Sequence, residues 1–583
     1  MPDNPSPGYW VLGTLIAFIA ASVWLGTVAQ RAMSKQRFLE GFFLGNRGLG
    51  AWALALTATV QSGGTFMGFP ALVYSHGWIV TLWIASYMIV PLTGFAIVGK
   101  RLAQISRKTQ TVTVPDMFRE RFGDARVGLV ASLLIMFFLS FTMIAQFKAG
   151  ATVMKLAIPG NGVMTLSEDL DSDAGQTSSG QTVKASAPAS NGLDTMYYVG
   201  LAVFGVTVVG YTMIGGFLAS VWTDLFQSVM MAIGVMILVC LAVPAAGGLE
   251  AATLTSMQKA APAYAFGPGY EPGGREFLPV GLAVSMFFIW VYAGFATPAS
   301  MIRVMAAQNT EVMRKSIALL AAYNCLIYIP LIMICIAARA ILPELSQPDE
   351  VIPRIAMHVT QKLPLGSLLT GLILAAPFGA IMASVSCFVL VIASGLVQDI
   401  YLRFLNPTAS QAQIRFVTRG AMVLVGLVGI LACLYPPKYL QALVVFSGSA
   451  GAATFVTPAL MACYWRRSSA GGVLAAMLIG FGVYLGLFAT GWVHNWALSF
   501  AESDSQGTFA GLAAQIVQLL GPDPKIGLAS MFRPYYLLGV DPVLWGLGAS
   551  AIAGVVGSLC TSPPPAELVA KFFDAAPAKP VKV

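Results

Sequence analysis

The chain has 583 residues, of which 57% are hydrophobic and 10% are charged, and its mean hydropathy is +0.76. This composition excludes an ordinary water-soluble globule and predicts a polytopic membrane protein. The net charge of +8 does not indicate a nucleic-acid partner, because the basic residues lie in short clusters between apolar spans rather than on one face.

Apolar segments of membrane-spanning length recur along the whole chain. They predict an all-α polytopic membrane protein with thirteen transmembrane helices, at 9–29, 50–75, 77–99, 127–157, 194–216, 221–244, 278–306, 315–342, 366–398, 416–435, 439–464, 470–491 and 540–560. An odd number places the two termini on opposite sides. The loops after spans 1, 3, 5, 7, 9 and 11 and the C-terminal tail, counted with the adjoining span ends, carry 22 Lys and Arg against 8 Asp and Glu. The segments on the other side of the membrane carry 9 Lys and Arg against 16 Asp and Glu. Because positive charge stays inside, we expect a cell (inner) membrane protein with its N-terminus outside and its C-terminus cytoplasmic.

Three segments depart from this compact pattern. Residues 158–193 are predicted to be a disordered outer loop, 335–365 a Pro-rich outer lid, and 492–539 an outer loop with a surface helix at Phe509 to Leu520. None carries an enzyme signature. The seven cysteines and three histidines show no metal-ligand spacing, so neither an enzyme nor a bound cofactor is expected.

The run from Ala58 to Pro70 lies inside an apolar span and yet does not favour an unbroken helix. Gly63, Gly64 and Gly68 each disfavour helix by roughly 1 kcal/mol relative to Ala, and Pro70 lacks an amide donor. A helix that opens here would expose carbonyls at mid-membrane, where transporters hold a cation and a solute. The alternative is a glycine-lined helix contact, in which small residues only allow close packing.

The thirteen spans also contain two sets of five, spans 2 to 6 and spans 7 to 11. Because five is odd, the second set must enter from the opposite face, as in inverted-repeat transporters. Span 7 contains a matching interruption at Gly294 and Pro298. We therefore expect a 5+5 inverted-repeat core with one helix before it and two after, divided as 1–49 (extra helix and loop), 50–244 (first repeat), 278–465 (second repeat) and 466–583 (two extra helices, a long outer loop and a short tail).

Short motifs occur in order through most of the chain, at Phe43 to Gly50, Ala58 to Tyr74, Gly215 to Gln227, Pro298 to Arg303, Ile352-Pro353, Leu374 to Pro377, Ala380 to Met382, Asp399 to Tyr401 and Tyr464-Trp465. Together they resemble the sodium:solute symporter family. Several of them are similar to the sodium/pantothenate symporter branch in particular. The resemblance covers roughly residues 35–480.

The resemblance implies a LeuT-type core with sodium held between the broken first core helix and span 9. Carried over by position, the sodium ligands fall at Ala58, Gln61, Ala380, Ala383 and Ser384. Ala383 departs from the family pattern, which has a hydroxyl there, and Ser386 points elsewhere on a helix. Sodium is the expected coupling ion, and a proton-coupled or sodium-independent transporter of the same fold remains the alternative.

Charged residues inside spans are candidate functional residues. Asp224 is either a group that attracts a cation leaving inward or a helix N-terminal acid capped by Thr223. Arg303 is interpreted as a snorkelling anchor or a loop contact rather than a solute ligand. Aromatic side chains that could gate the solute, or simply pack, are Trp83, Tyr87, Trp290 and Tyr292.

Lys148 places a cation within an otherwise apolar span, at a cost of roughly 2.5 to 3.5 kcal/mol near a helix centre. The sequence shows no acidic residue in the neighbouring spans at matching depth. An anionic solute would supply the missing charge, with Gln146, Ser62 and Thr65 completing its hydrogen bonds. The alternatives are that Lys148 stands in for a coupling cation, or that it snorkels to the outer headgroups.

The sequence thus predicts an ion-coupled secondary symporter that imports a small organic solute, a carboxylate such as pantothenate or another monocarboxylate, by alternating access. A channel would need a repeated filter motif, and a membrane sensor would need a soluble signalling module. Neither is evident in the sequence. The sequence leaves the oligomeric state open.

Overall fold

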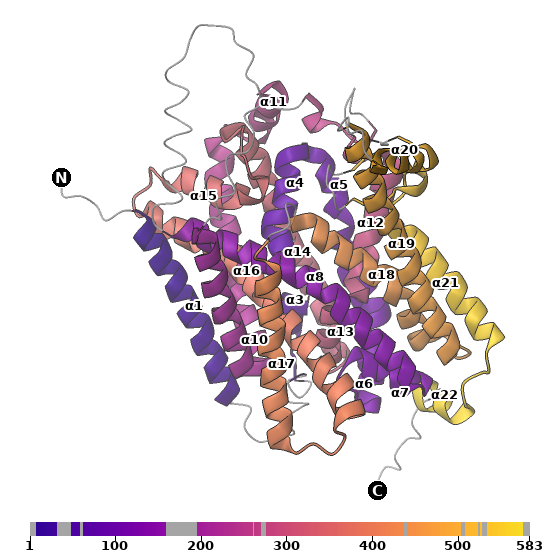
Figure 1. Cartoon of the computed structure of the whole chain (residues 1–583). Coiled ribbons are helices and arrows are strands. Elements are labelled where there is room, and N and C mark those ends of the chain that lie inside the picture. Colours follow the sequence, from indigo (N-terminus) through magenta and orange to yellow (C-terminus); the bar gives the residue numbers. More distant parts are fainter. Residues whose placement is uncertain are drawn as a thin grey trace.

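The computed structural model describes residues 7–31, 43, 48–58, 62–158, 195–259, 262–269, 276–435, 440–502, 508–522, 525–527 and 533–574. Apart from two isolated β-bridges, the regular structure of these residues is helical. The first helix begins at the upper end of the bundle in Figure 1, and the last helix lies at its lower end. All but the first residue of the predicted outer loop 158–193 lies outside the described part of the chain.

The first half of the chain forms α1 and the helices of the first predicted repeat. Their bounds are α1 Pro7–Arg31, α3 Ala51–Ala58, η2 Gly64–Gly68, α4 Phe69–His76, η3 Gly77–Ile79, α5 Val80–Ala85, η4 Ser86–Ile89, η5 Pro91–Gly99, α6 Lys100–Thr109, α7 Val114–Phe122, α8 Ala125–Ala157 and α10 Thr195–Ala245.

Two glycines turn the chain between spans in this half. Gly77 has φ +75° and separates α4 from α5, and a Cβ at this position would overlap the carbonyl oxygen of Tyr264. Gly216 has φ +61° and bends α10 between the predicted spans 5 and 6. A left-handed backbone of this kind favours glycine over any residue with a Cβ, so both boundaries have a local cause.

The second half continues with a surface segment and then the second predicted repeat. Its elements are α11 Leu249–Lys259, η6 Pro262–Ala265, α12 Val280–Ala296, α13 Pro298–Met305, α14 Thr310–Ile341, η7 Pro348–Glu350, α15 Val351–Thr360, α16 Gly366–Ser394, η8 Gly395–Leu405, α17 Gln411–Ala432, α18 Leu440–Tyr464, α19 Ala470–Glu502, α20 Thr508–Leu520, η9 Leu537–Gly539, α21 Pro542–Cys560 and α22 Ala566–Phe573.

Eleven helices in the described part are long and apolar enough to cross a membrane, so the count of thirteen separate spans is not confirmed. Spans 2 and 3 meet directly at Gly77, and span 7 is divided into the shorter helices α12 and α13. The predicted surface helix is confirmed as α20. The predicted lid is shorter than expected because α14 runs on to Ile341; we use "lid" below for η7 and α15.

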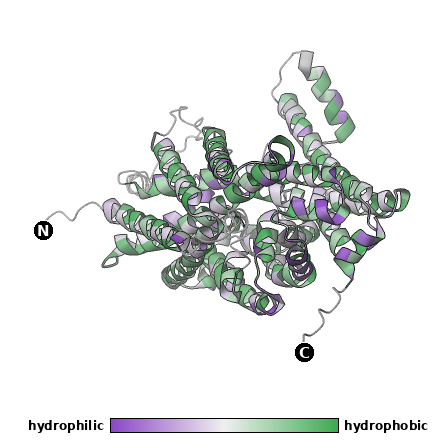
Figure 2. Ribbon diagram, turned by 90° about the horizontal axis from the view of Figure 1, so that it is seen from below, coloured by the Kyte–Doolittle hydropathy of each residue, from purple (hydrophilic) through white to green (hydrophobic). Residues whose placement is uncertain are grey.

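Helix α16 lies at the centre of the bundle and is buried along almost its whole length. It packs against α1, α8 and α10, while α19 and α21 pair at one side of the bundle (Figure 1). Apolar residues extend to the outermost helices when the bundle is seen end-on (Figure 2). Large apolar side chains such as Val206 and Phe416 point outward with 71% and 79% of their surface exposed. This outward apolar surface suits a lipid environment, in which the polar and charged groups must be satisfied inside the bundle.

Candidate functional site

Two interrupted helices cross the middle of the bundle in opposite directions. The first stops with α3 at Ala58 and resumes near Gly63, and α3 lies below α4 in Figure 1. The second breaks at Thr297, whose ψ of 118° is extended, and here α12 lies above α13. The first predicted break is confirmed. In the second, α12 continues through Gly294, and Pro298 opens the next helix, because proline restricts the residue before it to extended backbone.

Polar side chains from other helices hold the first helix where it resumes after the break. The buried Gln146 of α8 accepts a 2.6 Å hydrogen bond through Oε1 from the backbone N–H of Gly63. The Thr65 hydroxyl lies 3.1 Å from that of Tyr328 on α14, and the backbone N–H of Thr65 donates to the carbonyl of Ser62. Backbone groups freed by a helix break must find partners in a membrane protein. These contacts fix the shape of the break.

A cavity of about 130 Å³ lies between the two breaks. The residues that line it come from η2, α4, α5, η4, α8, α12, α13, α14, α16 and α18, and from the two breaks themselves. None of the described lining residues is charged. The polar lining residues are Ser62, Thr65, Tyr87, Thr142, Trp290, Thr297, Ser300, Tyr328, Gln441 and Ser447.

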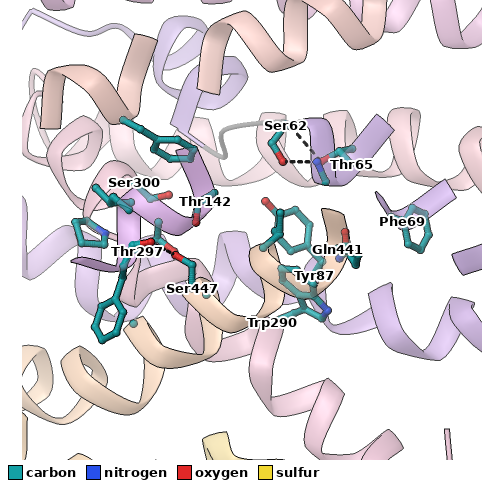
Figure 3. Close-up of a pocket in the computed structure, with 18 of the residues that line it drawn as sticks. Ser62, Thr65, Phe69, Tyr87, Thr142, Trp290, Thr297, Ser300, Gln441 and Ser447 are labelled. Carbon is teal, nitrogen blue, oxygen red and sulfur yellow. Dashed lines mark hydrogen bonds between the residues drawn. The ribbon is translucent and has the colours of Figure 1, made fainter. Parts of the chain in front are cut away.

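Figure 3 shows that the labelled lining residues form two groups. The hydroxyl group of residues is Thr142, Thr297, Ser300 and Ser447, next to the first turn of α13. The aromatic group includes Tyr87 and Trp290, whose rings meet edge to face at a centroid distance of 5.6 Å, together with Gln441. The cavity therefore offers a helix N-terminus with hydroxyls at one end and an aromatic, amide-bearing wall at the other.

Two polar atoms on this aromatic wall have no hydrogen-bond partner among the described residues. They are the indole Nε1 of Trp290 and the Oε1 of Gln441, whose side chain is 5% exposed. A buried polar atom without a partner costs about 1–3 kcal/mol. A solute that accepts from the indole and donates to the amide oxygen would remove this cost.

A buried ion pair closes the lower side of the first break. Arg303 Nη2 lies 2.6 Å from Asp224 Oδ2, and both side chains are 2% exposed. Arg303 Nη1 also donates to the carbonyl oxygen of Thr57, and the Ser228 hydroxyl donates to that of Leu56 at 2.8 Å. These are last-turn carbonyls of α3, which have no partner within the helix. Arg303 is therefore not a snorkelling anchor, and Asp224 is neither open to a cation nor at a helix N-terminus in this structure. Below, "inner lock" denotes Arg303, Asp224 and the Thr57 carbonyl.

The positions carried over as sodium ligands lie on α3 and α16. Ala58 ends α3, whereas Gln61 lies outside the described residues. On α16, the Ser384 hydroxyl donates to the Ala380 carbonyl at 2.9 Å. Ala383 supplies no side-chain oxygen, and its carbonyl accepts from the Ser386 hydroxyl at 3.0 Å. Ser386 also lies 3.0 Å from Ser220 of α10, whose hydroxyl donates to Asp224 of the inner lock.

The structure separates the residues predicted to bind the solute. Ser62, Thr65 and Trp290 line the cavity, whereas Gln146 lies behind it and bonds Gly63. Lys148 does not line the cavity; its Nζ lies 3.2 Å from Asp349 Oδ2 in the lid. Lys148 therefore has a carboxylate partner from a segment between spans rather than from a neighbouring span, so no solute is needed to supply the missing charge.

The predicted aromatic gates are likewise divided. Tyr87 lines the cavity, and Tyr292 stacks on Phe288 at 5.8 Å outside it. Trp83 stacks on Phe277 at 5.7 Å and borders a separate, smaller cavity of about 40 Å³.

Sequence reasoning missed several residues that line the cavity. Thr297 and Ser300 lie beside Pro298, so the interrupted motif itself was a usable signal for them. The remaining missed polar residues lie on separate helices without any local signal: Thr142, Tyr328, Gln441 and Ser447.

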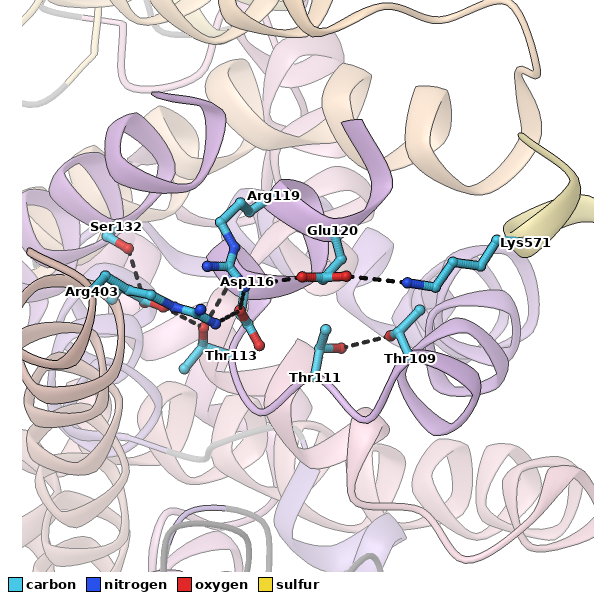
Figure 4. A network of polar contacts seen from close by, with 10 residues as sticks. Thr109, Thr111, Thr113, Asp116, Arg119, Glu120, Ser132, Arg403 and Lys571 are labelled. Atoms are coloured by element: carbon cyan, nitrogen blue, oxygen red, sulfur yellow. Dashed lines mark hydrogen bonds and ion pairs between the residues drawn. The ribbon is translucent and has the colours of Figure 1, made fainter. Parts of the chain in front are cut away.

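A second polar network lies apart from the cavity and joins α7, α8 and η8 (Figure 4). Thr113 and Ser132 each donate a 2.9 Å hydrogen bond to Asp399. Arg119 and Arg403 both bond Asp116 Oδ1, at 2.8 and 2.9 Å. Each of these groups has a partner on another part of the network. The network therefore connects α7, α8 and η8 at the lower end of the bundle.

Comparisons with known proteins agree with this architecture. A model of the "Sodium:solute symporter family" matches residues 42–165 and 180–480. The chain is 27% identical over 486 residues to the sodium/pantothenate symporter of Escherichia coli (strain K12), covering 82% of this chain and 90% of that protein. It is 24% identical over 532 residues to the sodium/proline symporter of the same organism, covering 90% and 95%.

One solved structure with a similar fold is a substrate-bound, outward-open state of a Na⁺-coupled sialic acid symporter. Its TM-score is 0.64 at 19% sequence identity, and the match covers 95% of this chain and 99% of that chain. At this identity the likeness shows a shared fold.

Proposed function

We propose that this chain, which belongs to the sodium:solute symporter family, imports a small organic carboxylate together with sodium through the cavity between its two broken helices. Membership makes it a Na⁺-coupled symporter of a small organic solute and a multi-pass membrane protein, not an enzyme. The observation that carries the finer proposal is the cavity itself, lined by hydroxyls, aromatic rings and an amide, with no charged side chain among its described lining residues.

A carboxylate suits the hydroxyl end of this cavity. The N-terminus of α13 carries a partial positive charge, and half-helix N-termini receive anionic solute groups in transporters. Thr297 and Ser300 stand at that terminus, with Thr142 and Ser447 opposite (Figure 3). The pantothenate symporters among the relatives support a carboxylate with an additional polar group. That group would meet Trp290 and Gln441.

The lack of a charged side chain among the described lining residues also supplies a physical reason for coupling. Moving an isolated anion into the protein interior is costly unless a charge partner accompanies it. A sodium ion at the carbonyls of Ala58, Gln61 and Ala380 and the hydroxyl of Ser384 would provide that charge from the neighbouring break. Ala383 contributes no hydroxyl, so this site relies on backbone oxygens.

The inner lock defines the route of release. Sodium leaving toward the cytoplasm passes Asp224, which becomes available to a cation only when Arg303 moves away from it. In this proposal the guanidinium and the departing ion therefore compete for one carboxylate.

Positive charge on the cytoplasmic side sets the orientation, with the N-terminus outside. We retain the division into 1–49, 50–244, 278–465 and 466–583, the two central segments being inverted repeats.

Uptake into proteoliposomes tests the function directly. A membrane potential of 100 mV contributes about 2.3 kcal/mol per imported charge, which allows roughly fiftyfold accumulation. Labelled pantothenate, other monocarboxylates, proline and sialic acid are compared with and without a sodium gradient. We expect concentrative, sodium-dependent uptake of a monocarboxylate. Uptake that follows an imposed proton gradient and ignores sodium would overturn the ion assignment, and a preference for an uncharged solute would overturn the carboxylate.

A matched pair on α8 tests the cavity. Thr142→Val removes a lining hydroxyl and should raise KM for the solute about tenfold, the effect of losing roughly one charge-assisted hydrogen bond. Ser140→Ala removes a hydroxyl that only donates to the carbonyl of Met136 at 2.7 Å, and should leave uptake unchanged. Equal effects of the two changes would place the solute elsewhere.

Labelling tests the orientation. A cysteine in place of Lys108 should react only from the cytoplasmic side, and one in place of Lys184 only from outside. Reaction of both from the same side would contradict the inverted-repeat arrangement.

A further inference from the structure

Lys148 and Asp349 form an ion pair between parts of the chain that are 201 residues apart. Lys148 belongs to α8, and Asp349 belongs to η7 in the lid; their side chains are 14% and 20% exposed. Burial raises the pKa of Asp349, and the ammonium of Lys148 opposes that rise. The pair thus joins a helix of the bundle to a connecting segment, in a position largely withdrawn from solvent.

The surroundings of this pair connect it to the cavity. Two residues before Lys148, Gln146 bonds the backbone of Gly63 in the first break. The lid element η7 packs against both η2 and α4, the continuation of that broken helix. One stretch of α8 therefore holds the unwound segment through Gln146 and the lid through Lys148. The lid thus contacts the element that carries Thr65, and a movement of the lid away from α8 must separate the ion pair.

We propose that the Lys148–Asp349 pair is an outer latch, which holds the lid over the cavity and breaks when the cavity opens to the outside. This inference rests on the proposed function, because only a transporter needs the cavity to open. The latch and the inner lock are both formed in this structure, on opposite sides of the cavity. Each is an ion pair between elements that separate when that side opens, so the chain uses one kind of contact to hold each side closed.

The lid also offers an internal control for this idea. Glu350 follows Asp349 and pairs at 2.9 Å with Arg354, four residues later in the same lid. This neighbouring pair does not join the lid to α8. Neutralising Glu350 removes one carboxylate from the same turn without touching the latch.

The test measures access to the cavity from outside, independently of any solute. A single cysteine replaces Val444, an apolar lining residue of α18, in a background without the native cysteines. Its reaction rate with a membrane-impermeant thiol reagent is measured in intact cells. Lys148→Met and Asp349→Asn should each raise this rate about tenfold, a shift expected for a partly buried ion pair. Lys148→Arg and Glu350→Gln should leave it at the wild-type value.

The charge-reversed pair Lys148→Asp with Asp349→Lys decides whether the pairing itself matters. It should restore a rate near that of the wild type. The proposal is overturned if the reporter cysteine in the charge-reversed pair reacts as fast as in the single variants. It is also overturned if Glu350→Gln raises the labelling rate as much as Asp349→Asn does, or if neither Lys148→Met nor Asp349→Asn raises it. Labelling reports on the latch and uptake reports on the proposed function, so the two can fail separately. Sodium-dependent uptake can be absent while the labelling rates change as expected, and uptake can be present while they do not change.

Discussion

Removing Arg303 should open the cytoplasmic side of the cavity. The guanidinium joins α13 to Asp224 of α10 and to the Thr57 carbonyl at the end of α3, and both charged side chains are 2% exposed. Arg303→Met leaves the carboxylate buried, with the Ser220 hydroxyl at 3.3 Å as its remaining side-chain hydrogen-bond donor among the described residues. It also leaves a last-turn carbonyl of α3 without its donor.

The magnitude follows from this burial. Removing one partner of a buried ion pair costs about 3–5 kcal/mol, because the other charge is left uncompensated. When the inner side opens, water reaches that charge, so the cost falls on the closed state. Even the lower value of about 3 kcal/mol corresponds to roughly a hundredfold shift toward the open state.

Labelling of the Val444→Cys reporter in inside-out vesicles measures this shift. We expect Arg303→Met to raise the reaction rate roughly a hundredfold, the shift that corresponds to about 3 kcal/mol. Adding Asp224→Leu should return most of the closed population, since replacing both members of a buried pair with apolar residues is often close to neutral. Uptake should be lost in the double variant, because the proposed exit carboxylate is gone. An unchanged rate in Arg303→Met, or a double variant at least as open as the single one, would refute the reasoning.

Three further outcomes are expected. Ser384→Ala should raise the sodium concentration needed for half-maximal uptake several-fold while protein levels stay constant, and an unaltered sodium dependence would remove this hydroxyl from the ion site. Gly68→Ala should lower uptake, because a Cβ at this position would overlap Oε1 of Gln441 and displace that amide from the cavity wall; normal uptake would show that the Gln441 side chain can move without loss of function. Phe572→Ala should lower the melting temperature, since this 3%-exposed ring anchors α22 and loss of a buried Phe costs about 3–5 kcal/mol; an unchanged melting temperature would mean that α22 is not part of the cooperative fold.

Much of the fold follows from local patterns in the sequence. Apolar length identified most of the membrane-crossing helices, and glycine or proline marked both helix breaks. These features are local, because a missing amide donor or an absent Cβ acts on the residue's own backbone. Helix ends were less well placed: α19 continues past its predicted end at 491 to Glu502, and α14 begins at Thr310, before its predicted start at 315.

The site was only partly determined by the sequence. Ser62, Thr65 and the residues around Pro298 were within reach, since a broken helix exposes its own neighbours. The partners of the charged residues were not. Burying a charge is costly wherever it occurs, so a lone Lys148 or Arg303 in an apolar span signals that a partner exists. The lone charge does not identify the partner residue, because Asp349 is 201 residues from Lys148 and Asp224 is 79 residues from Arg303 in sequence.

The sequence by itself thus determined a membrane-embedded helical bundle, the positions of its two interruptions and the family to which the motifs point. Only the tertiary structure decided that Lys148 of α8 pairs with Asp349 of the lid, and that Arg303 joins Asp224 to the end of α3. The physical reason is that helix propensity and hydrophobicity are properties of adjacent residues. Charge pairing and cavity lining instead depend on which faces of distant helices the packing brings together.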